Sequence, residues 1–171
     1  HLPRWLSALA LAAALNLTAS AQSLSYTGGT LTENFDGMGR LGASTPPGWF
    51  VGFGTSANTT AVTPGMGLQG PTATILGWNL GSTNGAGANP DTDRALGSGP
   101  TGAGNDGMIE VRIVNNSGQP IAAFEVRYDG EEWRTPQGSS PVDQLVLQFS
   151  INGTTFAALG AGFDFIRPVT S

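Results

Sequence analysis

The strongest constraint on the fold is an alternation of apolar and polar residues in the second half of the chain. It runs through residues 108–115, 121–128 and 145–151, where apolar side chains recur at every second position. This period places them on one face of an extended strand. Strands of this kind joined by turns indicate an all-β fold, an antiparallel β-sandwich. After residue 21 no segment carries a sustained 3.6-residue apolar period with caps, so helices are expected to be nearly absent.

Turn signals place the remaining strands and loops. Asn152-Gly153 predicts a two-residue type I′ hairpin. Residues 81–107 are rich in Gly, Asn, Ser and Thr and lose the apolar period, which predicts a long loop. Residues 24–35, around the Thr27-Gly28-Gly29 turn, are expected to form a first strand or a hairpin. Further strands are expected at 49–53 after Pro46-Pro47-Gly48, and at 59–62 and 73–80, where glycine interrupts the pattern.

The first 21 residues read as an export signal. Arg4 supplies the positive charge, residues 5–17 supply the apolar run, and Ala19 and Ala21 flank Ser20 in a small-residue cleavage site. The run is shorter than the roughly 20 residues that span a bilayer. We expect a signal-peptide helix at 1–21, cleavage after Ala21, a β-sandwich module over 22–171 and no transmembrane segment in the mature chain.

Composition excludes several kinds of chemistry from that module. The chain has no cysteine, and its one histidine, His1, precedes the cleavage site. Disulfides, thiolate metal sites, histidine-ligated metals and Ser-His-Asp hydrolysis are therefore excluded. All seven basic residues are arginine, so phosphate-loop and Schiff-base lysines are excluded too. After cleavage the chain contains six arginines and twelve acidic side chains, so its net charge is negative. This charge argues against nucleic-acid binding and suits an extracellular, calcium-binding protein.

Two candidate sites remain. Glu33 and Asp36 place two carboxylates where an opening strand runs into a turn, which fits part of a calcium site; the alternative is a pair of solvated acids. Tyr128, Trp133 and Arg134 form the densest polar-aromatic cluster and could line a ligand face. In the alternative, Trp133 packs on a sheet edge and Arg134 pairs with a carboxylate. The consecutive Glu131 and Glu132 point to opposite faces of an extended chain, so no catalytic residues are predicted.

Four motifs occur in a set order: Glu33-Asn34-Phe35-Asp36-Gly37-Met38, Pro46-Pro47-Gly48-Trp49, Asp93-Arg94-Ala95-Leu96-Gly97-Ser98 and Tyr128-Asp129-Gly130-Glu131-Glu132-Trp133-Arg134. Together they resemble the exported, jelly-roll-like β-sandwich modules of bacterial surface proteins. Some of these modules carry PEP-CTERM sorting tails, and others are attached to extracellular nucleases or lamin-tail domains. The resemblance implies a jelly roll without catalytic residues. Related jelly rolls often bind a cation beside an acidic closing strand, and we expect the closing strands to lie beyond residue 171.

The expected function follows from export, composition and this resemblance. We expect a non-catalytic module, secreted or on the cell surface, that acts in adhesion or polysaccharide contact and is stabilised by Ca²⁺. Two alternatives stay open. The chain could be the N-terminal accessory domain of a secreted hydrolase, such as an extracellular nuclease, whose catalytic domain follows it. It could also be a structural component of an extracellular matrix.

Overall fold

The computed structural model describes residues 23–54, 56–65, 77–81, 92–98, 106–131 and 144–166. The signal residues Ala19 and Ala21 and the predicted ligand residues Trp133 and Arg134 lie outside these ranges. The described chain is all-β and contains two 3₁₀ turns, η1 (Asp36–Met38) and η2 (Ala161–Phe163), but no α-helix. Its strands are β1 (Leu24–Tyr26), β2 (Trp49–Phe53), β3 (Ser56–Thr59), β4 (Thr63–Gly65), β5 (Trp78–Gly81), β6 (Arg94–Gly97), β7 (Gly107–Val111), β8 (Ile113–Asn115), β9 (Gln144–Leu145), β10 (Gln148–Phe149), β11 (Ala157–Ala158) and β12 (Phe165–Ile166).

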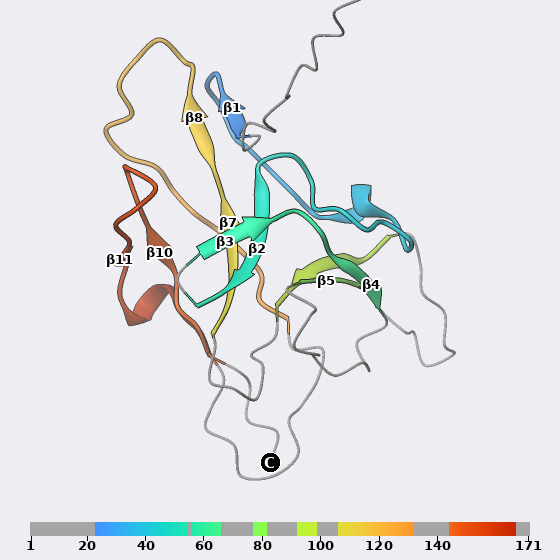
Figure 1. Ribbon diagram of the computed structural model, residues 1–171. Helices are drawn as coiled ribbons and strands as arrows, with labels where there is room; N and C mark the ends of the chain where they lie inside the picture. The colour runs from blue at the N-terminus through green and yellow to red at the C-terminus, as the bar shows by residue number, and fades with distance from the viewer. Residues whose placement is uncertain are drawn as a thin grey trace, which may run out of the picture.

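Two three-stranded sheets form the centre of the molecule (Figure 1). In the first, β2 lies between β3 and β7 and pairs antiparallel with both. In the second, β5 lies between β4 and β6, parallel to β4 and antiparallel to β6. Aromatic and β-branched residues dominate β2, and its middle residue Val51 is fully buried, as a central strand requires.

The remaining described strands form three two-stranded sheets. β1 pairs parallel with β8, while β10–β11 and β12–β9 are antiparallel pairs. The expectation of a purely antiparallel arrangement is therefore wrong for the β1–β8 and β4–β5 pairs. Parallel neighbours cannot be joined by a tight hairpin turn, so neither of these two pairs is a simple β-hairpin.

The predicted strand at 108–115 is present but changes partner at Arg112. Before this residue β7 pairs with β2, and after it β8 pairs with β1. The backbone of Arg112 marks the exchange: its N–H donates to Gly48 O at 2.9 Å, and its carbonyl accepts from Leu24 N at 2.7 Å. The apolar alternation runs through both strands because the chain stays extended across the exchange.

The other two alternating segments differ more from their predictions. Residues 121–128 form no strand. Residues 145–151 divide between the two-residue strands β9 and β10, and Ile151 beyond them is 96% exposed. A strand needs a partner that completes its hydrogen bonds, and the described chain provides none at 121–128.

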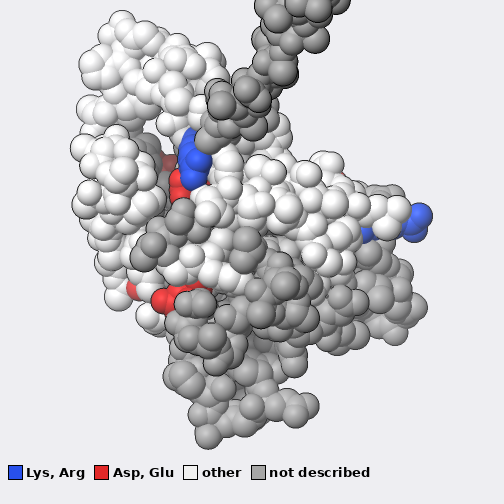
Figure 2. Space-filling view, viewed as in Figure 1, with Lys and Arg blue, Asp and Glu red and all other residues white. Residues whose placement is uncertain are grey.

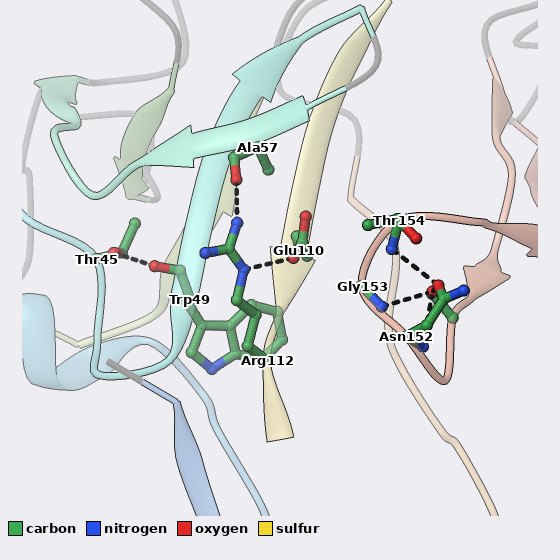
Figure 3. Close-up of polar contacts among 9 residues, drawn as sticks. Thr45, Trp49, Ala57, Glu110, Arg112, Asn152, Gly153 and Thr154 are labelled. Atoms are coloured by element: carbon green, nitrogen blue, oxygen red, sulfur yellow. Dashed lines mark hydrogen bonds and ion pairs between the residues drawn. The ribbon is translucent and has the colours of Figure 1, made fainter. Parts of the chain in front are cut away.

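Three loop predictions also need correction. The expected loop at 81–107 contains β6, which pairs with β5. The expected strand or hairpin at 24–35 reduces to β1. Asn152-Gly153 does lie in a hairpin, between β10 and β11, but the loop spans 150–156, and Asn152 lacks the positive φ of a type I′ turn. Its Oδ1 instead accepts from Thr154 N at 2.9 Å (Figure 3). It also accepts from Thr155 N at 2.9 Å.

The apolar core lies between the two central sheets and η1. Met38, Val51, Val62 and Leu96 form its buried cluster, and Phe35, Trp49 and Ile109 pack against it. The four buried side chains come from η1, β2, β6 and the connection between β3 and β4. The core therefore fixes η1 against the sheets, and η1 forms one wall of the candidate site.

A buried polar network extends the core. Asn79 is fully buried and Arg94 is 4% exposed. The Asn79 amide donates to Gly39 O at 2.7 Å and Gly42 O at 2.9 Å, and its oxygen accepts from Arg94 Nε at 2.8 Å. Arg94 Nη2 also donates to Asn79 O at 2.5 Å. The network ties the turn after η1 to β5 and β6, because each buried polar group there has found a partner.

A second arginine holds the first central sheet. The guanidinium of Arg112 lies 4.0 Å from the centre of the Phe50 ring. Its Nε is 2.6 Å from Glu110 Oε1, and its Nη2 donates to Ala57 O at 2.7 Å (Figure 3). Arg112 thereby links β2, β3 and β7 from one face of the sheet.

Candidate functional site

A surface groove of about 350 Å³ lies between η1 and the segment that leads into β2. Its volume is at the lower end of the range for ligand pockets, about 300 to 1,000 Å³. One wall comes from the turn around η1 and the other from the chain just before the Pro46-Pro47-Gly48 motif. The lining residues are Glu33, Gly37, Met38, Ser44, Thr45, Pro46 and Pro47.

The wall at Ser44 and Thr45 is fixed by pairing with the chain between β3 and β4. Ser44 forms an antiparallel bridge with Ala61. Thr45 N donates to Thr60 O at 2.8 Å, and Val62 N donates to Ala43 O at 3.1 Å. The backbone of Ser44 and Thr45 is therefore fixed at the groove.

A tight turn joins this wall to β2. Trp49 N donates to Pro46 O at 3.1 Å, and Gly48 has φ 81°, the value that a type II turn requires at its third residue. Pro47 supplies the fixed φ favoured at the second position. The Thr45 hydroxyl closes the corner by donating to Trp49 O at 2.6 Å (Figure 3). The motif therefore presents two proline rings at the groove on a rigid support.

The opposite wall is ordered by its own side chains. Glu33 Oε1 accepts from Phe35 N at 2.7 Å, and Asn34 Oδ1 accepts from Asp36 N at 3.1 Å. Phe35 adopts φ 62°, which is unfavourable for an aromatic residue, and its ring meets the Trp49 ring edge-on at 4.9 Å and 75°. The ring contact and the Glu33 bond hold Phe35 in this conformation, and the same bond fixes Glu33 at the groove.

The predicted calcium residues Glu33 and Asp36 lie on this same wall but face different surroundings. Glu33 lines the groove, whereas Asp36 is not one of its lining residues. Asp36 Oδ1 accepts from Arg94 N at 3.0 Å, and Oδ2 accepts from Asn34 Nδ2 at 3.0 Å. Both Asp36 oxygens thus connect η1 to its surroundings. Within the described ranges, no group of three or more His, Cys, Asp or Glu side chains could hold a metal ion.

The predicted ligand residue Tyr128 is 42% exposed, and its hydroxyl donates to Phe163 O. Trp133 and Arg134 fall outside the described residues, so the structure places one member of that cluster. Glu131 is exposed. The groove residues Ser44, Thr45, Pro46 and Pro47 were not predicted as a site, although the motif Pro46-Pro47-Gly48-Trp49 had marked their turn.

The groove lies on a chain with few charges. On the face in Figure 2, charged side chains are sparse among the described residues. The groove combines one carboxylate, which accepts hydrogen bonds, with two hydroxyls and with the apolar rings of two prolines. The Ser44 hydroxyl can donate and accept, whereas the Thr45 hydroxyl already donates to Trp49 O and can only accept from a ligand. This combination suits a polar, uncharged ligand that offers several hydroxyl groups.

Comparisons with protein-family models, with curated proteins and with solved structures gave no match. In the part of the chain that the structure describes, no helix is long and apolar enough to cross a membrane.

Proposed function

We propose that this chain is a non-catalytic, exported module that contacts extracellular polysaccharide, with the groove between η1 and Pro46-Pro47 as the contact site. The observation that carries the proposal is the groove itself: a carboxylate, hydroxyls and proline rings converge there on a rigid support. A β-sandwich of the jelly-roll kind, expected from the sequence, is part of the proposal.

Polysaccharide is favoured over other ligand classes by the chemistry of the lining. A sugar presents hydroxyl groups that can donate to a carboxylate such as Glu33 and to the Thr45 hydroxyl oxygen, and that can exchange hydrogen bonds with Ser44. Its C–H faces fit against the rings of Pro46 and Pro47. An anionic ligand such as nucleic acid is disfavoured, because the groove carries a carboxylate and the chain is acidic overall.

Export is supported by the pattern of residues 1–21, with Ala19 and Ala21 at the proposed cleavage site. Sequencing the N-terminus of the protein from the culture medium of an expressing bacterium tests this directly. A mature chain that begins at Gln22 supports export, and a chain that stays in the cytoplasm with residues 1–21 intact contradicts it.

Ser44→Trp tests the groove because an indole at this exposed position fills it. Binding is measured on a glycan array and then by calorimetry with the polysaccharide that gives the strongest signal. We expect Ser44→Trp to weaken binding at least about tenfold, the equivalent of one or two lost hydrogen bonds and the excluded contact area. Thr30→Trp, at an exposed position outside the groove lining, is the matched control.

Three results would count against the proposal. The first is that the chain binds no glycan on the array, which would favour a purely structural role. Ser44→Trp and Thr30→Trp could weaken binding equally, which moves the contact elsewhere. Turnover of a nucleic acid or a glycoside by the purified chain would show that the module is catalytic.

A further inference from the structure

Residues 121–128 form an extended-looking segment with alternating apolar and charged side chains that belongs to no sheet among the described strands. The segment is the orange coil after β8 in Figure 1, and it makes no β-bridge. On one side Phe124 is 66%, Val126 41% and Tyr128 42% exposed. On the other, the side chains of Glu125 and Arg127 are 73% and 87% exposed. A segment with the alternation of a strand is thus open to solvent on both faces.

Its backbone is suited to pairing with another strand. Pro120 precedes the segment, and no proline occurs from 121 to 131, so every residue there carries an N–H donor. None of these residues has a positive φ. Unpaired donors and acceptors along such a segment form a template for a further strand.

The order of side chains around Val126 is self-complementary. The sequence Phe124-Glu125-Val126-Arg127-Tyr128 reads aromatic, acidic, aliphatic, basic, aromatic from either end, except that the charge changes sign. When two copies of this segment run antiparallel with Val126 opposite Val126, Glu125 of each copy faces Arg127 of the other. In the same register, Phe124 of each copy faces Tyr128 of the other. Opposite charges and aromatic pairs are the cross-strand neighbours that stabilise antiparallel strands.

We propose that the chain forms a symmetric dimer by antiparallel pairing of residues 124–128 from two copies about Val126. The occupant is a second copy because a single register satisfies both charge pairs and both aromatic pairs at once. A two-fold interface brings the same surface of both copies together, so that surface has to be complementary to itself. The order of side chains around Val126 meets this requirement. The proposal goes beyond polysaccharide contact and does not depend on it.

The present contacts of the segment are compatible with this pairing. Tyr128 is anchored at its tip, where its hydroxyl donates to Phe163 O, and its ring remains partly exposed. Gly130 packs closely on the Phe165 ring, with no room for a Cβ between them, and so holds the end of the segment. Arg127 Nε contacts Glu125 Oε1 of its own chain at 2.6 Å, an exposed pair that contributes little and can reorganise across the dimer.

Charge reversal tests the register. Glu125→Arg places arginines opposite each other in the dimer, and Arg127→Glu places glutamates opposite each other. We expect each single variant to raise the dimer dissociation constant at least about tenfold, because two charge pairs become repulsive by symmetry. The exchanged variant Glu125→Arg/Arg127→Glu restores both attractive pairs and is expected to dimerise like the parent chain.

The experiment is sedimentation velocity over a concentration series with the full chain. A mixture of the Glu125→Arg and Arg127→Glu variants adds a stringent arm, since each should dimerise only with the other. Thermal unfolding of each variant confirms that these exposed substitutions leave the fold intact. A parent chain that is monomeric at every concentration, or an exchanged variant that dimerises no better than the single variants, overturns the proposal.

Discussion

Asn79→Ala is the substitution that most directly tests how the core is held together. Asn79 is fully buried, and its amide joins three partners: Gly39 O at 2.7 Å, Gly42 O at 2.9 Å and Arg94 Nε at 2.8 Å. Alanine removes the amide and leaves two carbonyls and one guanidinium N–H with a lost partner. Because these groups are part-buried or buried, water replaces the amide poorly.

The expected loss follows from the number and kind of bonds. Two neutral hydrogen bonds contribute about 1 kcal/mol each and the bond from the charged guanidinium about 2 kcal/mol, so Asn79→Ala should lower the free energy of unfolding by about 4 kcal/mol. This is a large part of the roughly 5 to 15 kcal/mol that stabilises an ordinary domain. The variant should therefore fold only marginally.

Urea unfolding followed by tryptophan fluorescence measures the change, since Trp49 and Trp78 both lie on strands of the central sheets. Asn116→Ala is the control: its side chain is exposed and donates to Ser25 Oγ at 2.7 Å, so its loss should stay within about 0.5 kcal/mol. A double-mutant cycle with Arg94→Met isolates the contact between the two side chains, for which we expect a coupling of about 2 kcal/mol. A loss below about 1 kcal/mol for Asn79→Ala, with no coupling to Arg94, would refute the reasoning.

Three further predictions concern packing, charge and calcium. Gly77→Ala puts a Cβ 2.6 Å from Val51 Cγ2 and should destabilise the fold by about 1 to 3 kcal/mol in urea unfolding, whereas Gly162→Ala meets nothing within 4 Å and should be close to neutral. Equal effects of the two would contradict the placement of Val51. Arg112→Leu loses the Phe50, Glu110 and Ala57 contacts and should cost about 2 kcal/mol by the same measurement; an unchanged midpoint would show that these contacts contribute nothing. If Ca²⁺ binds at Glu33 and Asp36, a chelator should lower the melting temperature of the parent chain but not of Glu33→Gln, and an unchanged parent melting temperature contradicts the site.

The alternation in the sequence predicted strand character well where the chain found a partner. Most of the alternating segment 108–115 is strand, because its first part pairs with β2 and its second part with β1. Residues 49–53 are also a strand, but it was the preceding turn that predicted this one. The same alternation at 121–128 produced no strand. The alternation shows which side chains share a face of an extended segment. A β-strand also needs a second strand to complete its backbone hydrogen bonds, and that partner comes from another part of the chain.

The candidate site was predicted only in part for a similar reason. Glu33 was singled out because it is a carboxylate beside a turn, and it does line the groove. Ser44 and Thr45 carried no signal of their own, because isolated hydroxyl residues are common in loops. They line the same groove as Glu33 in a fold where Ser44 pairs with Ala61 and Asn79 binds the carbonyls of Gly39 and Gly42.

The sequence by itself determined the all-β class, the near absence of helix and the turn at Pro46-Pro47-Gly48, because these depend on local backbone preferences and on the two-residue period. Only the tertiary structure decided which strands pair, that β1–β8 and β4–β5 run parallel, and that Arg94 is buried against Asn79. It also decided the groove, whose walls come from separate segments. Such features depend on contacts between residues far apart in the chain, and a local pattern does not encode which distant residue will satisfy a given backbone group or buried charge.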